Sequence, residues 1–77
     1  GERRREVQRI REEAEAARNR GLVYAERKDY ALALLQFKRA LELADAIGAE
    51  GFGGQPWEHR SQIEADVRAL QAVEGGR

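Results

Sequence analysis

Apolar and small residues recur every three or four positions along much of the chain, and this is the spacing of one face of an α-helix. The first such stripe predicts a long helix over residues 2–28, a stretch without proline. Oppositely charged residues three or four positions apart, such as Arg9 and Glu13, support this helix on its exposed faces. The positions of the stripe are Val7, Ile10, Ala14, Ala17, Gly21 and Tyr24.

The most apolar part of the chain comes next and predicts a second helix over residues 30–47. Asp29 is a residue type that favours the N-cap of a helix, and Gly48 is one that favours its C-terminal end. Because three further leucines widen the apolar stripe, we expect neighbours on more than one side of this helix. The positions of the stripe are Tyr30, Ala33, Leu34, Phe37, Ala40, Leu41, Ala44 and Ile47.

Glycine is frequent over residues 48–55, which predicts a flexible loop. A third helix is predicted over residues 56–74, with Pro56 at its first position or, failing that, with a capping box over residues 61–64. No segment alternates between apolar and polar residues over more than a few positions, so strands are not expected. The pattern therefore predicts an all-α fold in which residues 1–77 form a single small helical domain. The apolar positions of the third helix are Trp57, Ile63, Val67, Leu70 and Val73.

Composition narrows the possible chemistry. The chain has 77 residues with no cysteine and one histidine, which excludes disulfides, thiolate metal sites and multi-histidine metal sites. No apolar stretch approaches the roughly 20 residues that span a bilayer, and the first residues lack the apolar run of a signal peptide. We therefore expect a cytoplasmic protein with no metal, no cofactor and no membrane partner. A domain of this size buries only about 60% of the surface of its unfolded chain, so regular helix packing or a partner must supply stability.

The titratable side chains do not predict catalysis. His59 is the only histidine, and the only serine, Ser61, lies two positions away on another face of the predicted helix. The acidic pairs lie among arginines on solvated helix faces, and no glycine-rich phosphate loop is followed by a lysine. The sequence therefore predicts a protein that is not an enzyme.

A basic run near the N-terminus makes nucleic-acid binding one alternative. Arg3, Arg4 and Arg5 are followed by Arg9 and Arg11, but glutamates are interleaved with them and no aromatic side chain lies among them. The 14 basic and 14 acidic residues of the chain also balance, whereas a nucleic-acid interface normally has an uncompensated basic face. A solvated helix with ion pairs is the better interpretation of this run.

Gly21 and Tyr24 lie three positions apart, Ala33 and Phe37 lie four apart, and Ala40 follows Phe37 by three. With this spacing, residues 14–47 resemble one tetratricopeptide repeat, a unit of about 34 residues. Ala17, Arg20 and Asp45 depart from the family pattern, which favours Trp, Leu and Pro there. The resemblance implies an antiparallel helical hairpin. Since no second copy follows, the third helix resembles a divergent first half of a next repeat or a cap, and residues 2–13 resemble an extension in front of the repeat. The residues that match the signature in register are Gly21, Tyr24, Tyr30, Ala33, Phe37 and Ala40.

The glycine of this signature has a physical explanation. A glycine in a helix interior costs about 1 kcal/mol relative to alanine, so Gly21 needs a compensating contact. With no Cβ at Gly21 and only methyl groups at Ala17, Ala33 and Ala40, the two helices can pack near the short end of the usual range of about 8–10 Å. We therefore predict close packing of the hairpin at Gly21, with Tyr24, Tyr30 and Phe37 filling the gaps.

In proteins of this family the first helix lines a concave groove, which implies a protein or peptide partner. Arg18 and Asn19 resemble the residues with which such repeats hold a peptide carboxylate. Leu22 stands where an amide would be needed, so we expect a mixed polar and apolar groove. The main hypothesis is a non-catalytic protein–protein interaction or assembly module. The candidate partner-binding face consists of Glu15, Arg18, Asn19, Leu22, Ala25 and Glu26.

Self-association is the other alternative, with further copies of the chain as the partner. About three repeats are usually needed to bury a continuous core, so a single repeat leaves helix faces uncovered. Charge is also unevenly spread. Seven arginines against five glutamates give +2 over residues 2–20, and three arginines against five acidic residues give −2 over residues 50–77. Sedimentation across a range of concentrations distinguishes this hypothesis from binding of a separate partner.

Overall fold

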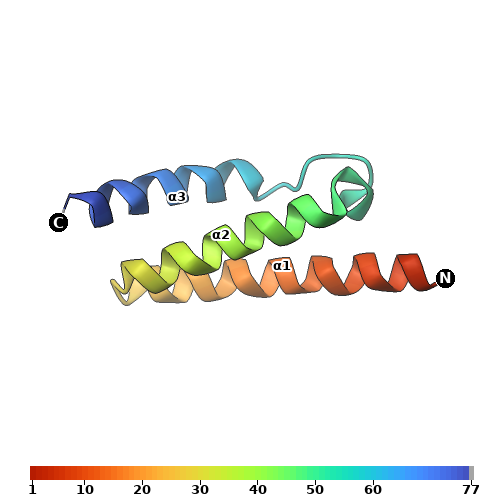
Figure 1. The fold of residues 1–77 in the computed structure, drawn as a ribbon, viewed down its shortest axis with the longest axis horizontal. Coiled ribbons are helices and arrows are strands. Elements are labelled where there is room, and N and C mark those ends of the chain that lie inside the picture. The colour runs from red at the N-terminus through yellow and green to blue at the C-terminus, as the bar shows by residue number, and fades with distance from the viewer. Residues whose placement is uncertain (77) are drawn as a thin grey trace.

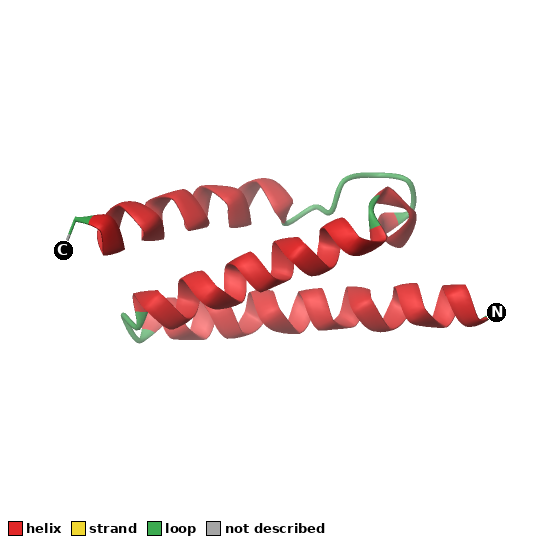
Figure 2. Ribbon diagram, viewed as in Figure 1, coloured by secondary structure: helices red, strands yellow, loops and turns green. Residues whose placement is uncertain are grey.

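The structure is a computed structural model that describes residues 1–76. Over these residues it contains the α-helices α1 (Glu2–Glu26), α2 (Tyr30–Ile47) and α3 (Arg60–Gly75), a short 3₁₀ helix η1 (Ala49–Phe52), and no strand. Figure 1 shows the order of these elements along the chain, and Figure 2 shows that loops form only the connections and the ends. The prediction of an all-α helical hairpin with a third helix is confirmed.

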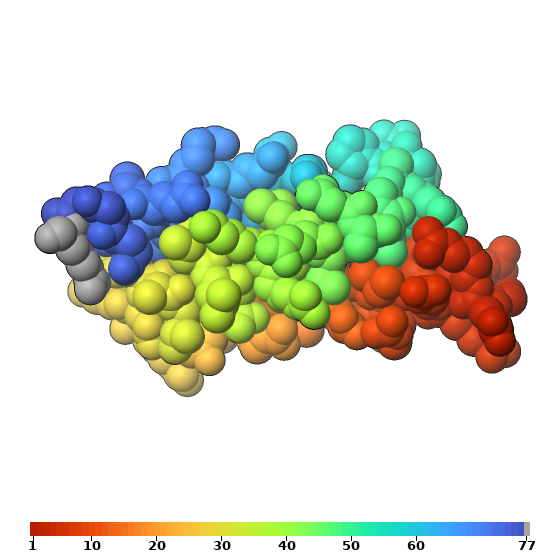
Figure 3. Space-filling model, in the orientation of Figure 1, coloured from red at the N-terminus to blue at the C-terminus, as the bar shows by residue number. Residues whose placement is uncertain are grey.

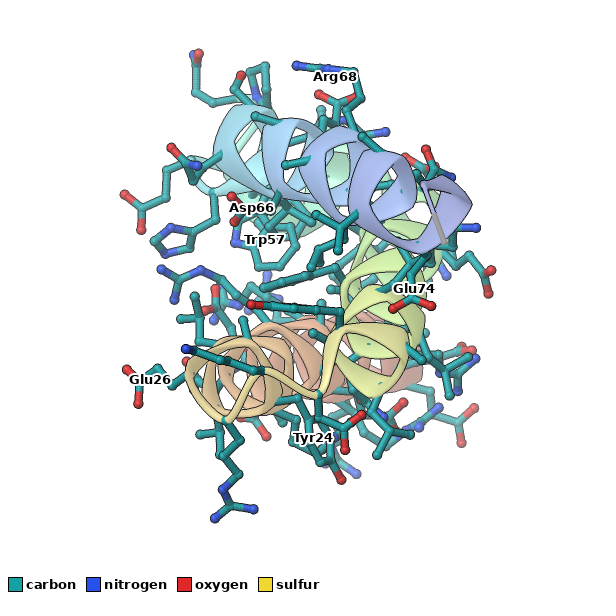
Figure 4. All side chains as sticks on the ribbon, turned by 90° about the vertical axis from the view of Figure 1, so that its left-hand side faces the viewer. Tyr24, Glu26, Trp57, Asp66, Arg68 and Glu74 are labelled. Atoms are coloured by element: carbon teal, nitrogen blue, oxygen red, sulfur yellow. The ribbon has the colours of Figure 1, made fainter. Side chains whose placement is uncertain are left out.

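The three helices form an elongated bundle of 47 × 18 × 15 Å. α1 and α2 run antiparallel side by side, while α3 packs on α2 and runs in the same direction as α1 (Figure 1). Viewed along the bundle, the helices occupy the corners of a triangle, so that α1 and α3 border one open side (Figure 4). In the space-filling view the first turns of α1 project beyond the other elements at one end (Figure 3).

Small residues build the interface of the hairpin. Ala17, Ala33 and Ala40 are fully buried, and Phe37, only 1% exposed, is the largest side chain beside them. A Cβ atom added to Gly21 would lie 2.7 Å from the ring of Phe37. Gly21 is therefore in tight contact with the opposing helix, and the ring of Phe37 fills the space there, as predicted. The core also includes the buried Ala14, Ala44, Trp57, Ile63 and Leu70 and, packed against them, the half-buried Tyr24, Tyr30, Leu34, Leu41 and Val67.

The turn between α1 and α2 ends the first helix at Glu26, two residues before the predicted end. Lys28 adopts a left-handed conformation with φ of 62°. Its amide donates to the carbonyl of Ala25 at 3.0 Å, and the amide of Asp29 donates to the carbonyl of Tyr24 at 2.9 Å. This pair of bonds is a Schellman motif, which satisfies carbonyls at the end of the helix. Asp29 is the N-cap of α2 as predicted, but its carboxylate makes no capping hydrogen bond.

The segment after α2 is more ordered than a flexible loop. Gly48 ends α2 as predicted, with φ of 57°. The expected loop then contains η1, in which Gly51 is buried against Ile47 so closely that an added Cβ would collide with that side chain. Glu50 of η1 forms an ion pair with Arg3 at 3.4 Å. η1 therefore covers the beginning of α1, and the predicted extension over residues 2–13 is an unbroken part of that helix.

The third helix begins at Arg60, so the prediction of a start at Pro56 is wrong, as is the alternative capping box, because His59 is the N-cap. The cause is Trp57. Its side chain is only 4% exposed and its ring stacks on Phe52, with centroids 5.5 Å apart and 16° between the planes. Anchoring the indole in the core fixes the preceding segment in a non-helical path, and α3 begins one turn later, where the amide of Arg60 donates to the carbonyl of Trp57.

Candidate functional site

α1 and α3 border the same open side of the bundle, which we call the α1–α3 face. Figure 4 shows Trp57 and Asp66 directed into the space between the two helices, with Glu26 projecting from α1 at its edge. Two separate hollows lie on this face. The residues that line its hollows from the two helices and the loop before α3 include Glu15, Leu22, Ala25, Trp57, Asp66, Ala69 and Leu70.

One end of the α1–α3 face carries a small apolar cavity of about 240 Å³. Leu22 and Ala25 form its α1 wall, Ala69 and Leu70 form its α3 wall, and Phe37 from α2 also lines it. Leu22 is 37% exposed, so an apolar rim remains open to solvent. A cavity of this size lies below the usual range for small-molecule sites, about 300–1,000 Å³, and is better matched to one side chain of a partner.

Asp66 supplies the acidic group at this cavity. It projects from α3, and its Oδ1 atom accepts a hydrogen bond from Nε2 of Gln62 at 2.9 Å, one turn earlier on the same helix. The cavity is therefore apolar on most of its wall, with one carboxylate that can receive a donor from a bound segment. This combination of apolar contact and a polar group fixes both the position and the orientation of a ligand.

The other end of the α1–α3 face is a wider hollow of about 650 Å³ beside the loop before α3. Glu15 accepts a hydrogen bond from the indole Nε1 of Trp57 at 2.9 Å, which ties α1 to that loop. Buried indole N–H groups require such a partner, because an unpaired buried donor costs about 1–3 kcal/mol. Arg11 and Glu58 contribute opposite charges to the same hollow. This end is thus polar and aromatic, in contrast to the apolar cavity.

The six residues of the predicted partner-binding face do not all lie together. Glu15, Leu22 and Ala25 line the α1–α3 face. Arg18 is half-buried, and its position three residues after Glu15 and four before Leu22 places it on the same side of α1. Asn19 lines a separate hollow. The exposed Glu26 is the sixth residue and projects at the edge of the face (Figure 4).

Sequence reasoning missed the contribution of α3 and its preceding loop to this face. Asp66, Ala69 and Leu70 could not be assigned to it, because the relative rotation of α1 and α3 depends on how each packs on α2. Trp57 carried one usable signal: a buried indole needs an acceptor. The sequence offered many carboxylates as that acceptor, and only the structure identifies Glu15.

His59, the histidine beside the loop before α3, contacts the neighbouring Glu58 and Trp57. Nε2 of His59 lies 3.4 Å from Oε1 of Glu58, and its ring meets the edge of Trp57 with centroids 5.8 Å apart. Within residues 1–76 no group of three or more His, Cys, Asp or Glu side chains is arranged to hold a metal ion. None of the helices described is both long enough and apolar enough to cross a membrane.

The N-terminal arginines are partly engaged with acidic groups. Arg3 pairs with Glu50, and Arg9 pairs with Glu13 one turn further along α1. All four of these side chains are at least 41% exposed, so each pair contributes no more than about 1 kcal/mol. The predicted interpretation as a solvated helix with ion pairs agrees with this arrangement.

Comparison of the chain with protein-family models, curated proteins and solved structures finds no match.

Proposed function

We propose that the chain is a non-catalytic protein-interaction module of tetratricopeptide type, which binds a peptide segment of another protein along the α1–α3 face. The observation that carries the proposal is the open apolar cavity between Leu22 and Ala25 of α1 and Ala69 and Leu70 of α3. The resemblance of residues 14–47 to one repeat supports it, because the first helices of such repeats line a concave groove. A cytoplasmic location is part of the same proposal.

The two ends of the face set the character of the peptide. The apolar cavity accepts one aliphatic or aromatic side chain, and Asp66 at its wall accepts a hydrogen bond from the peptide. The hollow beside Trp57 presents Arg11 and Glu58, so polar or charged side chains are favoured there. The expected ligand is a short segment with one buried apolar anchor and polar residues on one side of it, and such anchors carry most of the free energy of binding at protein interfaces.

The test is a selection followed by measurement on matched variants. Peptides are selected from a random library displayed on phage against the wild-type chain, and their affinities are then measured by fluorescence anisotropy. Ala69→Arg fills the cavity from an exposed position, and arginine is a good helix former, so α3 is expected to stay folded. We expect this variant to weaken the selected peptides by at least about tenfold, or about 1.4 kcal/mol.

Ala72→Arg is the matched control, because Ala72 is also an exposed alanine of α3 but does not line the cavity. The same added charge and volume at this position should change the affinity by less than about twofold. Peptides that lose affinity equally in the two variants, or in neither, would bind elsewhere. A library that yields no saturable ligand would contradict peptide binding as the function.

A further inference from the structure

The hairpin has a second surface on the side away from α3, which we call the back face. Tyr24 marks this side in Figure 4, below the hairpin, while α3 lies above it. A hydrogen bond from Nε of Arg20 on α1 to Oε1 of Gln36 on α2, 2.9 Å long, joins the two edges that meet there. Repeated steps of three or four positions from each partner, such as 20 to 23 to 27 on α1 and 36 to 32 to 35 on α2, continue these edges along the two helices. The back face consists of Arg20, Val23, Arg27, Lys28, Leu32, Leu35 and Arg39.

Three large aliphatic side chains of the back face are exposed to solvent. Leu35 is 60% exposed, Val23 is 44% exposed and Leu32 is 39% exposed. Over the part of the chain that the structure describes, these are three of the five large hydrophobic residues that are exposed, the others being Leu22 and Val73. A cluster of exposed aliphatic side chains on a small protein indicates an interaction surface.

The charge of the back face differs from that of the chain. Arg20, Arg27, Lys28 and Arg39 give the seven residues of the back face four positive charges and no negative one, and acidic residues lie only next to this set, such as Asp29, Glu26 and Glu42. The whole chain has a net charge of zero. Within residues 1–76 no carboxylate lies within ion-pair distance of these four cations, whose charges are thus available to a ligand.

Two of the cations lie beside the aliphatic side chain of Val23 on α1. Arg20 and Arg27 line a shallow hollow of about 250 Å³ together with Asn19, Val23 and Tyr24. Because Gln36 binds Nε of Arg20, the guanidinium is held beside the hollow while its terminal nitrogens face no described carboxylate. A guanidinium fixed in this way loses little conformational freedom on binding a carboxylate with two parallel hydrogen bonds.

We propose that the back face binds an acidic amphipathic helix of a partner protein. The apolar stripe of that helix covers Val23, Leu32 and Leu35, and its Asp and Glu side chains pair with Arg20, Arg27 and Arg39. Helix docking onto an apolar groove is a common mode of recognition, and complementary charge determines which helix is accepted. The aliphatic centre distinguishes this surface from a nucleic-acid interface, where phosphate contacts and aromatic stacking dominate. The proposal is independent of peptide binding at the α1–α3 face.

A designed peptide series tests the proposal. The probe is a helical peptide of about 14 residues, about 21 Å long, with leucines every three or four positions and glutamates beside them. Fluorescence anisotropy should give saturable binding that weakens as salt is added. Arg27→Glu and Leu35→Ser change exposed side chains without described partners, and each should weaken binding by at least about tenfold. Circular dichroism checks that both variants remain folded.

The matched controls lie on α3. Arg68→Glu makes the same charge change as Arg27→Glu, and Val73→Ser removes a similarly exposed aliphatic side chain. Both controls should change the affinity by less than about twofold. Ala69→Arg, which blocks the α1–α3 face, should also leave this affinity unchanged. Loss of binding at one face can therefore be distinguished from loss of binding at the other.

Several results would overturn the proposal. These are no saturable binding, equal losses in the α3 controls, or equal binding of a peptide with the same composition but no amphipathic order. Two other occupants are tested directly, with duplex DNA and with phosphatidylserine vesicles. If either binds more tightly than the peptide and depends on Arg27, the surface recognises phosphate. If sedimentation shows a dimer that Leu35→Ser dissociates, the occupant is a second copy of the chain.

Discussion

Gly21 lies in the interior of α1, five residues before its end, where alanine would stabilise a solvated helix by about 1 kcal/mol. The ring of Phe37 opposes that gain, because an added Cβ would approach its Cδ1 and Cε1 atoms to 2.7 Å. The ring is only 1% exposed and is packed among the core residues, so moving it away from an added Cβ would disturb that packing. For Gly21→Ala, helix propensity therefore raises the free energy of unfolding, whereas core packing lowers it.

We expect Gly21→Ala to destabilise the protein. Overpacking of a core costs about 1–3 kcal/mol, which exceeds the gain in helix propensity and leaves a net loss of up to about 2 kcal/mol. Urea unfolding followed by circular dichroism measures this change. In a Phe37→Leu background the ring is absent, so the same substitution should become neutral or stabilising.

Gly75→Ala provides the control for the Gly21 prediction. Gly75 is also helical, at the end of α3, but no atom lies within 4 Å of an added Cβ there. Alanine should therefore raise the stability at that position, by no more than about 1 kcal/mol. If Gly21→Ala stabilised the protein as Gly75→Ala does, Phe37 would not be the reason for the glycine.

At the scale of elements, α3 is joined to the hairpin through the segment that precedes it. Trp57 inserts between the elements, with its ring stacked on Phe52 and its N–H group bonded to Glu15 of α1. Arg60 at the start of α3 adds an ion pair with Asp45 of α2 at 2.6 Å. The segment before α3 is thus tied to α1, and the first turn of α3 is tied to α2.

Trp57→Ala should release α3 from the hairpin. Replacing a buried tryptophan by alanine costs about 3–5 kcal/mol, a large part of the stability of a small domain. Trp57→Phe keeps an aromatic ring and loses mainly the hydrogen bond to Glu15, so we expect a smaller loss of about 1–2 kcal/mol. Amide hydrogen exchange is the most direct measurement, because the amides of α3 should lose protection before those of α1 and α2.

This interpretation requires that Trp57→Ala and Trp57→Phe lower the stability by different amounts. Equal destabilisation by alanine and phenylalanine would assign the effect to the hydrogen bond with Glu15 instead of the buried ring. Uniform loss of protection over all three helices would mean that α3 and the hairpin unfold as one unit, and that the docking of α3 is not separable from the rest of the fold.

At the scale of the whole molecule, α1 is longer than its partner in the hairpin, and its first turns project at one end of the bundle (Figure 3). η1 covers part of this projection. Val7 is buried there, whereas the ion pair between Arg3 and Glu50 joins side chains that are 58% and 60% exposed. The contribution of the first residues to stability should therefore depend on whether Val7 is retained.

Removing residues 1–5 should lower the free energy of unfolding by less than about 1 kcal/mol, because only an exposed ion pair and solvated helix are lost. Removing residues 1–8 also deletes Val7, and burial of a valine side chain contributes about 1.5–3 kcal/mol. Thermal unfolding of the two shortened chains measures the difference. Equal stability of the two would show that the contact of Val7 with its surroundings contributes nothing.

Local spacing along the chain was sufficient to predict several elements. Val7, Ala14, Ala17 and Gly21 are the buried residues of α1, as their spacing indicated, and Gly48 ends α2 as expected. These features depend on side chains within one or two turns of each other, so the sequence reports them directly. The start of the third helix was predicted wrongly, because local preferences at residue 56 and after it were overridden by burial of the indole one residue later.

The candidate site was likewise predictable only in part from the sequence. The spacing of Glu15, Leu22 and Ala25 was sufficient to place them on one side of a helix. It could not predict which residues of α3 lie beside them, or that Asn19 lines a different hollow. The spacing of apolar residues, the capping types and the composition determined an all-α chain with a close-packed hairpin. Only the tertiary structure decided which faces remain open and which charges surround them, since the rotation of each helix is set by contacts between residues far apart in the sequence.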